Sequence, residues 1–233
     1  MDQTEAELVI EWFIDLESRL RGYLRTVPIN WNHNATLPLL AGIVLEAGGL
    51  VDSIFRMEFN PSDCRSKRKN LNITHFATQY ERRYSLSRKS SIIYQYPPVL
   101  LAPFYTWTIQ KQNGAIDLDW WDAYNKLKHE RIEQYAQCTL ANAVKSLCAL
   151  HQMLAVLPCF FRSLIAHDMV ALRGYAIPYA IDSVEQGAVD MPFLVESDLF
   201  ATPFGEQCFP ADLNQVSGAI YGGSRRLEQF LGR

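Results

Sequence analysis

The longest stretch without a helix breaker, residues 117–157, constrains this 233-residue chain more than any other feature. It contains neither glycine nor proline, and Pro158 follows it directly. As one helix it would extend about 60 Å at ~1.5 Å per residue. Its first part is polar and its second part is apolar, so we expect a bend near residues 133–137. The stretch predicts a mainly α fold.

Other segments carry helical periodicity. Residues 4–25 repeat apolar side chains at four-residue steps, and residues 36–56 are broadly apolar, with Pro38 in the first turn, where proline is tolerated. A short helix is expected at residues 71–84, and a last one at residues 159–172. We therefore predict a bundle of four to five helices over residues 1–174.

The composition changes after residue 174. Proline and glycine recur every few residues, with phenylalanine and leucine between them. Residues 175–233 are expected to form an irregular acidic extension with short strands, packed on the bundle by its aromatic residues, and a short helix near the end.

Charge is distributed unevenly, although the net charge is only −3. Eight basic residues with one acid among them gather in residues 65–89, whereas residues 174–224 contain several acids and neither lysine nor arginine. Such a split predicts a basic surface, which can bind RNA, and an acidic surface that competes for it. The five scattered cysteines suit a reducing compartment. No signal peptide and no apolar run of ~18 residues is evident, so we expect a cytoplasmic protein without a membrane span.

One face of the long predicted helix resembles a functional site. Asn125 and His129 are four residues apart, so they lie one turn apart on the same face. Asp122 and Glu133 extend this stripe. A second stripe beside it carries Tyr124, Lys128 and Arg131. Histidine is the side chain whose charge changes near neutral pH, which suits proton transfer.

The pattern W-W-x-x-Y-N-x-x-K-H-x-R at residues 120–131 resembles that of bacterial proteins with a HEPN-like domain. The resemblance covers roughly residues 5–170 and implies a helical bundle that pairs as a homodimer. Many HEPN domains are metal-independent endoribonucleases of toxin–antitoxin and anti-phage systems, so the resemblance also implies an antitoxin or defence partner protein and no cofactor.

The resemblance assigns roles to individual residues. The family motif is an arginine, a polar residue and, after a short spacer, a histidine. Here Tyr124 stands at the arginine position, Asn125 at the polar position and His129 at the histidine position. We expect His129 to be the catalytic acid–base group, Asn125 to orient the phosphate or the imidazole, and Arg131 to supply positive charge. The residues expected to contact RNA are Lys126, Lys128, Tyr124 and the Asp52–Arg56 pair, which matches an acid-x-x-x-base pair common in the family.

Two other interpretations remain open. Tyr124 in place of arginine favours a non-catalytic HEPN-like module that binds RNA or a protein. His129 and Glu133 also have the i,i+4 spacing of two metal ligands, although no second histidine pair accompanies them. Gly222-Gly223-Ser224 lacks the strand-to-helix context of a phosphate-binding loop, so we expect no such loop there.

Overall fold

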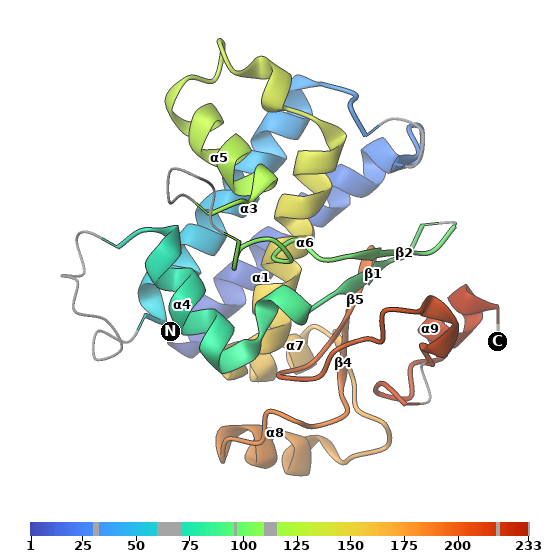
Figure 1. Ribbon diagram of the computed structural model, residues 1–233. Coiled ribbons are helices and arrows are strands. Elements are labelled where there is room, and N and C mark those ends of the chain that lie inside the picture. Colours follow the sequence, from blue (N-terminus) through green and yellow to red (C-terminus); the bar gives the residue numbers. More distant parts are fainter. Residues whose placement is uncertain (30–32, 60–70, 96, 110–115, 218–219, 233) are drawn as a thin grey trace. The chain divides into compact units, whose positions relative to one another are not determined.

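The computed structural model describes residues 1–29, 33–59, 71–95, 97–109, 116–217 and 220–232 (Figure 1). Within them the fold is α+β, with eight α-helices and one five-stranded sheet, so the prediction of a mainly α bundle is wrong. The helices are α1 (Gln3–Leu24), α3 (Pro38–Met57), α4 (Ile73–Tyr84), α5 (Asp119–His129), α6 (Leu140–Val156), α7 (Phe161–Ala166), α8 (Ile177–Glu185) and α9 (Arg225–Leu231). The strands are β1 (Ser91–Ile93), β2 (Val99–Leu101), β3 (Val170–Ala171), β4 (Leu194–Glu196) and β5 (Phe200–Pro203).

The sheet overturns the interpretation of the C-terminal part as an irregular extension. All pairings are antiparallel, in the order β2-β1-β5-β4-β3. The central strand β5 pairs with β1 on one side, through Ile92 and Ala201, and with β4 on the other. The strand β3 replaces the end of the helix that we expected at residues 159–172. The C-terminal segment therefore completes the sheet and is not an appendage.

Contacts divide the chain into two compact units. Unit 1 comprises residues 1–14, 89–102 and 151–233, and unit 2 comprises residues 15–88 and 103–150. The whole sheet belongs to unit 1, whereas the described regular structure of unit 2 is helical apart from an isolated bridge between Thr36 and Thr139. Both units are discontinuous in sequence, whereas we predicted a single boundary at residue 174; that boundary stays a prediction.

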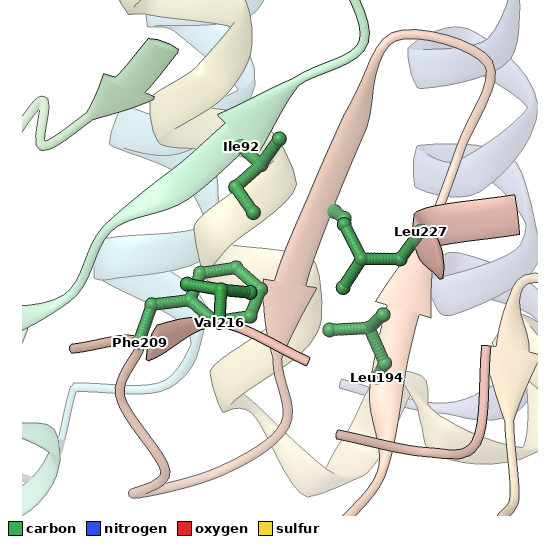
Figure 2. Packing of buried hydrophobic residues seen from close by; sticks show 6 residues of the cluster. Ile92, Leu194, Phe209, Val216 and Leu227 are labelled. Carbon is green, nitrogen blue, oxygen red and sulfur yellow. The ribbon is translucent and has the colours of Figure 1, made fainter. Parts of the chain in front are cut away.

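Unit 1 has an apolar core on its sheet (Figure 2). Ile92 of β1, Leu194 of β4 and Leu227 of α9 are fully buried, and Phe209 and Val216 from the connecting segment pack against them. The C-terminal helix thus contributes directly to the core, because its only fully buried residue, Leu227, lies in this cluster.

Unit 2 is organised around aromatic rings. The ring of Phe55 on α3 lies 4.8–6.4 Å, centroid to centroid, from those of five neighbours, which are Phe76, Tyr80, Phe104, Trp107 and Trp121. The turn after Pro103 packs on the helix of the Trp-Trp motif: Phe104 meets Trp120 edge to face at 5.7 Å.

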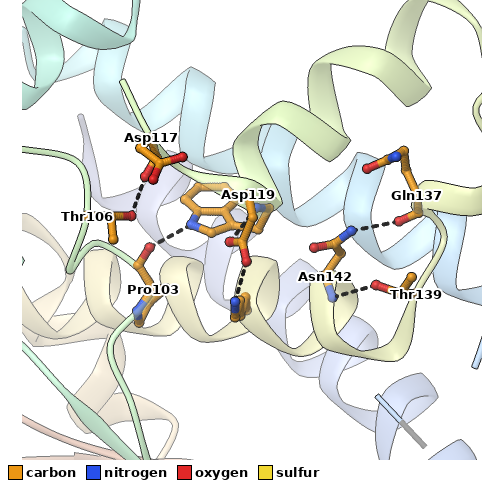
Figure 3. Close-up of polar contacts among 9 residues, drawn as sticks. Pro103, Thr106, Asp117, Asp119, Gln137, Thr139 and Asn142 are labelled. Carbon is orange, nitrogen blue, oxygen red and sulfur yellow. Dashed lines mark hydrogen bonds and ion pairs between the residues drawn. The ribbon is translucent and has the colours of Figure 1, made fainter. Parts of the chain in front are cut away.

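The predicted long helix is broken. α5 ends at His129, and α6 begins only at Leu140. Residues 138–141 instead bond with residues 33–37: Leu37 donates to the Cys138 carbonyl, and Leu140 donates to the Ala35 carbonyl. Asn142 stabilises the start of α6, because its backbone N–H donates to the Thr139 hydroxyl and its side-chain amide donates to the Gln137 carbonyl (Figure 3). These contacts between distant segments outcompete the continuation of the helix, although no local breaker is present.

Helix α3 is long and apolar enough to cross a membrane, with a mean hydropathy of 1.6 over its most apolar window. Half of that window is buried within the protein, which is also the behaviour of a core helix. Its neighbours include α5, against which it packs. α6 and the helical segment from Pro158 to Ala166 are together also long and apolar enough to cross a membrane, but the two segments are bent by 85° relative to each other.

Candidate functional site

The close approach of α3 and α5 creates the candidate site in unit 2. A Cβ atom on Gly48 would lie 2.6 Å from Cγ and Cδ2 of Tyr124, so only glycine leaves room for the tyrosine ring. Tyr124 itself is 4% exposed. Tyr124 is therefore a packing residue that joins the two helices.

This contact leads to a matched pair of substitutions. Gly48→Ala is expected to lower the free energy of unfolding by about 1–3 kcal/mol, because its methyl group overpacks the interface with Tyr124. Gly49→Ala, with nothing within 4 Å of the added atom, is expected to raise it by roughly 0.5–1 kcal/mol through helix propensity. Urea unfolding measures both. Equal effects of the two substitutions would contradict the close contact.

The hydroxyl of Tyr124 takes part in a charged network. Lys128 Nζ donates to Tyr124 Oη at 3.0 Å and lies 3.9 Å from Asp52 Oδ2. Asp52 Oδ1 accepts from Arg56 Nε at 3.0 Å. The hydrogen bond with Tyr124 and the negative charge of Asp52 raise the pKa of Lys128. The acid–base pair of α3 and the motif of α5 therefore meet on one surface.

The remaining motif residues differ in what they can do. Asn125 is half-buried, and its amide donates to the Trp121 carbonyl at 3.0 Å, which leaves its side-chain oxygen as an acceptor. Lys126 and His129 are exposed on the last turns of α5. Among the described residues the His129 side chain has no hydrogen-bond or ion-pair partner. Arg131 is exposed in the turn after the helix. Because α5 ends at His129, the first predicted stripe does not extend to Glu133 and the second does not extend to Arg131.

Contacts that the sequence analysis missed fix the start of α5 (Figure 3). Trp120 Nε1 donates to the Pro103 carbonyl at 2.8 Å, and the Thr106 hydroxyl donates to the Asp117 carbonyl. Asp119 forms an ion pair with Lys145 of α6. The only signal in the sequence was the Trp-Trp pair itself, because an indole N–H that is buried needs an acceptor.

The predicted basic surface is described only in part. Residues 65–69 lie outside the described residues, and Arg82, Arg83 and Arg88 are exposed. Lys89, in contrast, is fully buried in unit 1, where Nζ donates to the carbonyls of Gly205 and Gln207. Burial lowers the pKa of Lys89 to about 8. Lys89 is thus a structural residue and does not contribute to a basic surface.

Within the described ranges no group of three or more histidine, cysteine, aspartate or glutamate side chains is placed to hold a metal ion. The i,i+4 arrangement of His129 and Glu133 is lost because α5 ends at His129.

No known protein family, no curated protein and no solved structure matches the chain.

Proposed function

We propose that the chain is a HEPN-like, metal-independent endoribonuclease that acts in the cytoplasm in toxin–antitoxin or anti-phage defence. The observation that carries the proposal is the meeting of two separate parts of the motif, Asp52–Arg56 on α3 and Tyr124–Lys128 on α5, on one surface. RNA is the expected ligand because Lys126, Lys128 and Arg131 offer exposed cations beside an exposed imidazole.

The chemistry follows from these groups. The imidazole of His129 accepts the proton of a ribose 2′-hydroxyl, whose oxygen then bonds to the adjacent phosphorus while the bond from phosphorus to the 5′-oxygen breaks. The departing oxygen takes a proton from a second imidazolium, and the cations stabilise the charge on the phosphate. The described residues of one chain supply one such imidazole in the site, so we propose a homodimer in which the second copy provides the other.

A second candidate function is a non-catalytic module that binds RNA or a defence partner protein. It is favoured by the burial of Tyr124 against Gly48, because this places a neutral packing residue where the family has its cation. Under this alternative the exposed lysines still bind RNA, but no phosphodiester bond is cleaved.

The experiment compares His129→Gln with the wild type on labelled single-stranded RNA in EDTA. We expect the wild type to leave 2′,3′-cyclic phosphate and 5′-hydroxyl ends, and His129→Gln to lose cleavage at least a hundredfold, as for the removal of a general acid–base group. Because the His129 side chain is exposed, the melting temperature of the His129→Gln variant should equal that of the wild type. His167→Gln, a partly exposed histidine of unit 1, is the matched control and should remain fully active.

RNA affinity separates the two candidates. Lys126→Gln should weaken binding and reduce the salt dependence by about one counterion in either case. Binding without cleavage by the wild type would establish the non-catalytic function and reject the nuclease. Absence of both RNA binding and RNA cleavage would reject the nuclease and the RNA-binding module alike.

A further inference from the structure

A pocket of about 520 Å³ lies entirely within unit 1 and is distinct from the candidate RNA site. Gly222 lines it; its φ is +69°, and a Cβ atom there would lie 2.5 Å from the Ala171 carbonyl oxygen. The Gly222 N–H donates to the Pro192 carbonyl at 2.7 Å. Glycine is therefore required here, and it holds residues 222–226 against the edge of the sheet.

One wall contains a backbone conformation that is unusual for its residue. Arg173 has a φ of +49°, in the left-handed region that typically costs a non-glycine residue about 1–3 kcal/mol. Its backbone N–H donates to the Gly222 carbonyl at 2.7 Å, which fixes this conformation. Strain of this kind concentrates at ligand-binding positions. The arrangement places a guanidinium group at the pocket although another residue type would fit the backbone better.

Three arginines line the pocket, and they are not equivalent. Arg226 is held in place, since its guanidinium lies 4.4 Å from the Tyr94 ring centroid and donates to the Asp198 carbonyl at 2.7 Å. Arg173 and Arg225 are exposed, and their side chains have no hydrogen-bond or ion-pair partner in the part of the chain that the structure describes. The guanidinium groups of Arg173 and Arg225, together with the fixed one of Arg226, can bind a doubly charged anion, because guanidinium binds phosphate oxygens bidentately.

Acceptors are available on the same pocket. Glu196 Oε1 accepts hydrogen bonds from the Tyr94 hydroxyl and, at 2.7 Å, from the Ser224 hydroxyl. Oε2 can therefore accept a bond from a ligand, and Asp168 provides a further exposed carboxylate. Carboxylates would repel a bare anion, but they accept hydrogen bonds from hydroxyl groups. The ligand should therefore carry an anionic group for the arginines and hydroxyl groups for the carboxylates.

We propose that this pocket binds the phosphomonoester of a small hydroxylated molecule, such as a sugar phosphate or a mononucleotide. Arg173 and Arg225 bind the phosphate, and Glu196 accepts from a hydroxyl of the ligand. The volume falls within the usual range of small-molecule sites, about 300–1,000 Å³. The glycine pair in Gly222-Gly223-Ser224 thus gains a role that its sequence context had not indicated.

The test is calorimetric titration of the full chain with ribose 5-phosphate, AMP, inorganic phosphate and ribose. We expect ribose 5-phosphate to bind more tightly than inorganic phosphate, and ribose to give no heat. Tighter binding of AMP identifies a mononucleotide, and equal or weaker binding of AMP identifies a sugar phosphate. No binding of either phosphomonoester at millimolar concentration would overturn the proposal.

Variants then locate the binding. Arg173→Asn and Arg225→Gln should each weaken ribose 5-phosphate binding about tenfold to a hundredfold, as expected for the loss of a charge-assisted hydrogen bond; asparagine tolerates the left-handed backbone. Glu196→Gln should weaken ribose 5-phosphate but not inorganic phosphate. Arg162→Gln, an exposed arginine of unit 1 paired with Glu185 away from the pocket, is the matched control. Unchanged affinity in the two pocket variants, or an equal loss in Arg162→Gln, would reject the site. RNA cleavage plays no part in these binding measurements, so their outcome for the pocket is independent of whether the proposed nuclease activity exists.

Discussion

Replacement of Phe55 by alanine is expected to lower the free energy of unfolding by about 3–5 kcal/mol, the usual cost of deleting a buried aromatic ring. Phe55 is fully buried, and its ring stacks on Phe76 at 5.1 Å and meets Tyr80 at 4.8 Å. The surrounding rings come from α4, from the turn after Pro103 and from α5, so they cannot all collapse into the space left by the substitution. The loss should appear as a lower denaturation midpoint in urea with an unchanged slope.

The matched control for Phe55→Ala is Tyr105→Ala in the same unit. Tyr105 is 66% exposed, so its removal should change stability by less than about 0.5 kcal/mol. A cost below ~1 kcal/mol for Phe55→Ala would mean that the aromatic cluster is not the core of unit 2.

Acidification is expected to destabilise unit 1 through His151. This side chain is fully buried between the rings of Phe13 and Phe200, at 5.4 and 5.5 Å, and Nδ1 pairs with the Thr202 hydroxyl at 2.8 Å. Burial lowers the pKa of His151 to about 3. In the unfolded chain the imidazole regains its ordinary value near 6.5, so the unfolded state binds more protons between about pH 6.5 and pH 3. Stability is therefore lost as the pH falls through this window, with an upper bound of about 5 kcal/mol at ~1.4 kcal/mol per pKa unit.

The difference between wild type and His151→Gln isolates this contribution, because every other titrating group is shared. Glutamine retains a polar group for the Thr202 hydroxyl but does not titrate. We expect the wild type to lose stability more steeply than His151→Gln below pH 6.5. Parallel pH profiles for wild type and His151→Gln would show that the imidazole is not held neutral.

Local patterns predicted the parts of this fold that depend on local sequence. The amphipathic and apolar periods gave α1 and α3 to within about two residues, and the four-residue spacing correctly placed Asp52 beside Arg56, 3.0 Å apart. The pairing of Asn125 with His129 on one helix was also correct, since both lie in α5. These features depend on side chains within one or two turns of each other.

The features that were missed depend on distant segments. Nothing near Glu130 stops a helix; the break follows from the pairing of residues 138–141 with residues 33–37. The strand Ser91–Ile93 is buried on both faces and is three residues long, so it shows no alternation of polar and apolar side chains. The sequence could not decide between a packing role and an RNA-binding role for Tyr124, because its partner Gly48 is 76 positions earlier.

The strand order also determines when each part of the chain can fold during synthesis. β1 finds β2 almost at once, but its other neighbour, β5, is translated 109 residues later, as counted from Ile92 to Ala201. At about 5–20 residues per second, the ribosome needs roughly 5–20 s to supply it. During that interval β1 exposes an unpaired apolar edge, which is a template for aggregation and a target for chaperones. Unit 2 ends at Leu150 and is fully translated before that strand appears, so the vulnerability of the nascent chain is confined to unit 1.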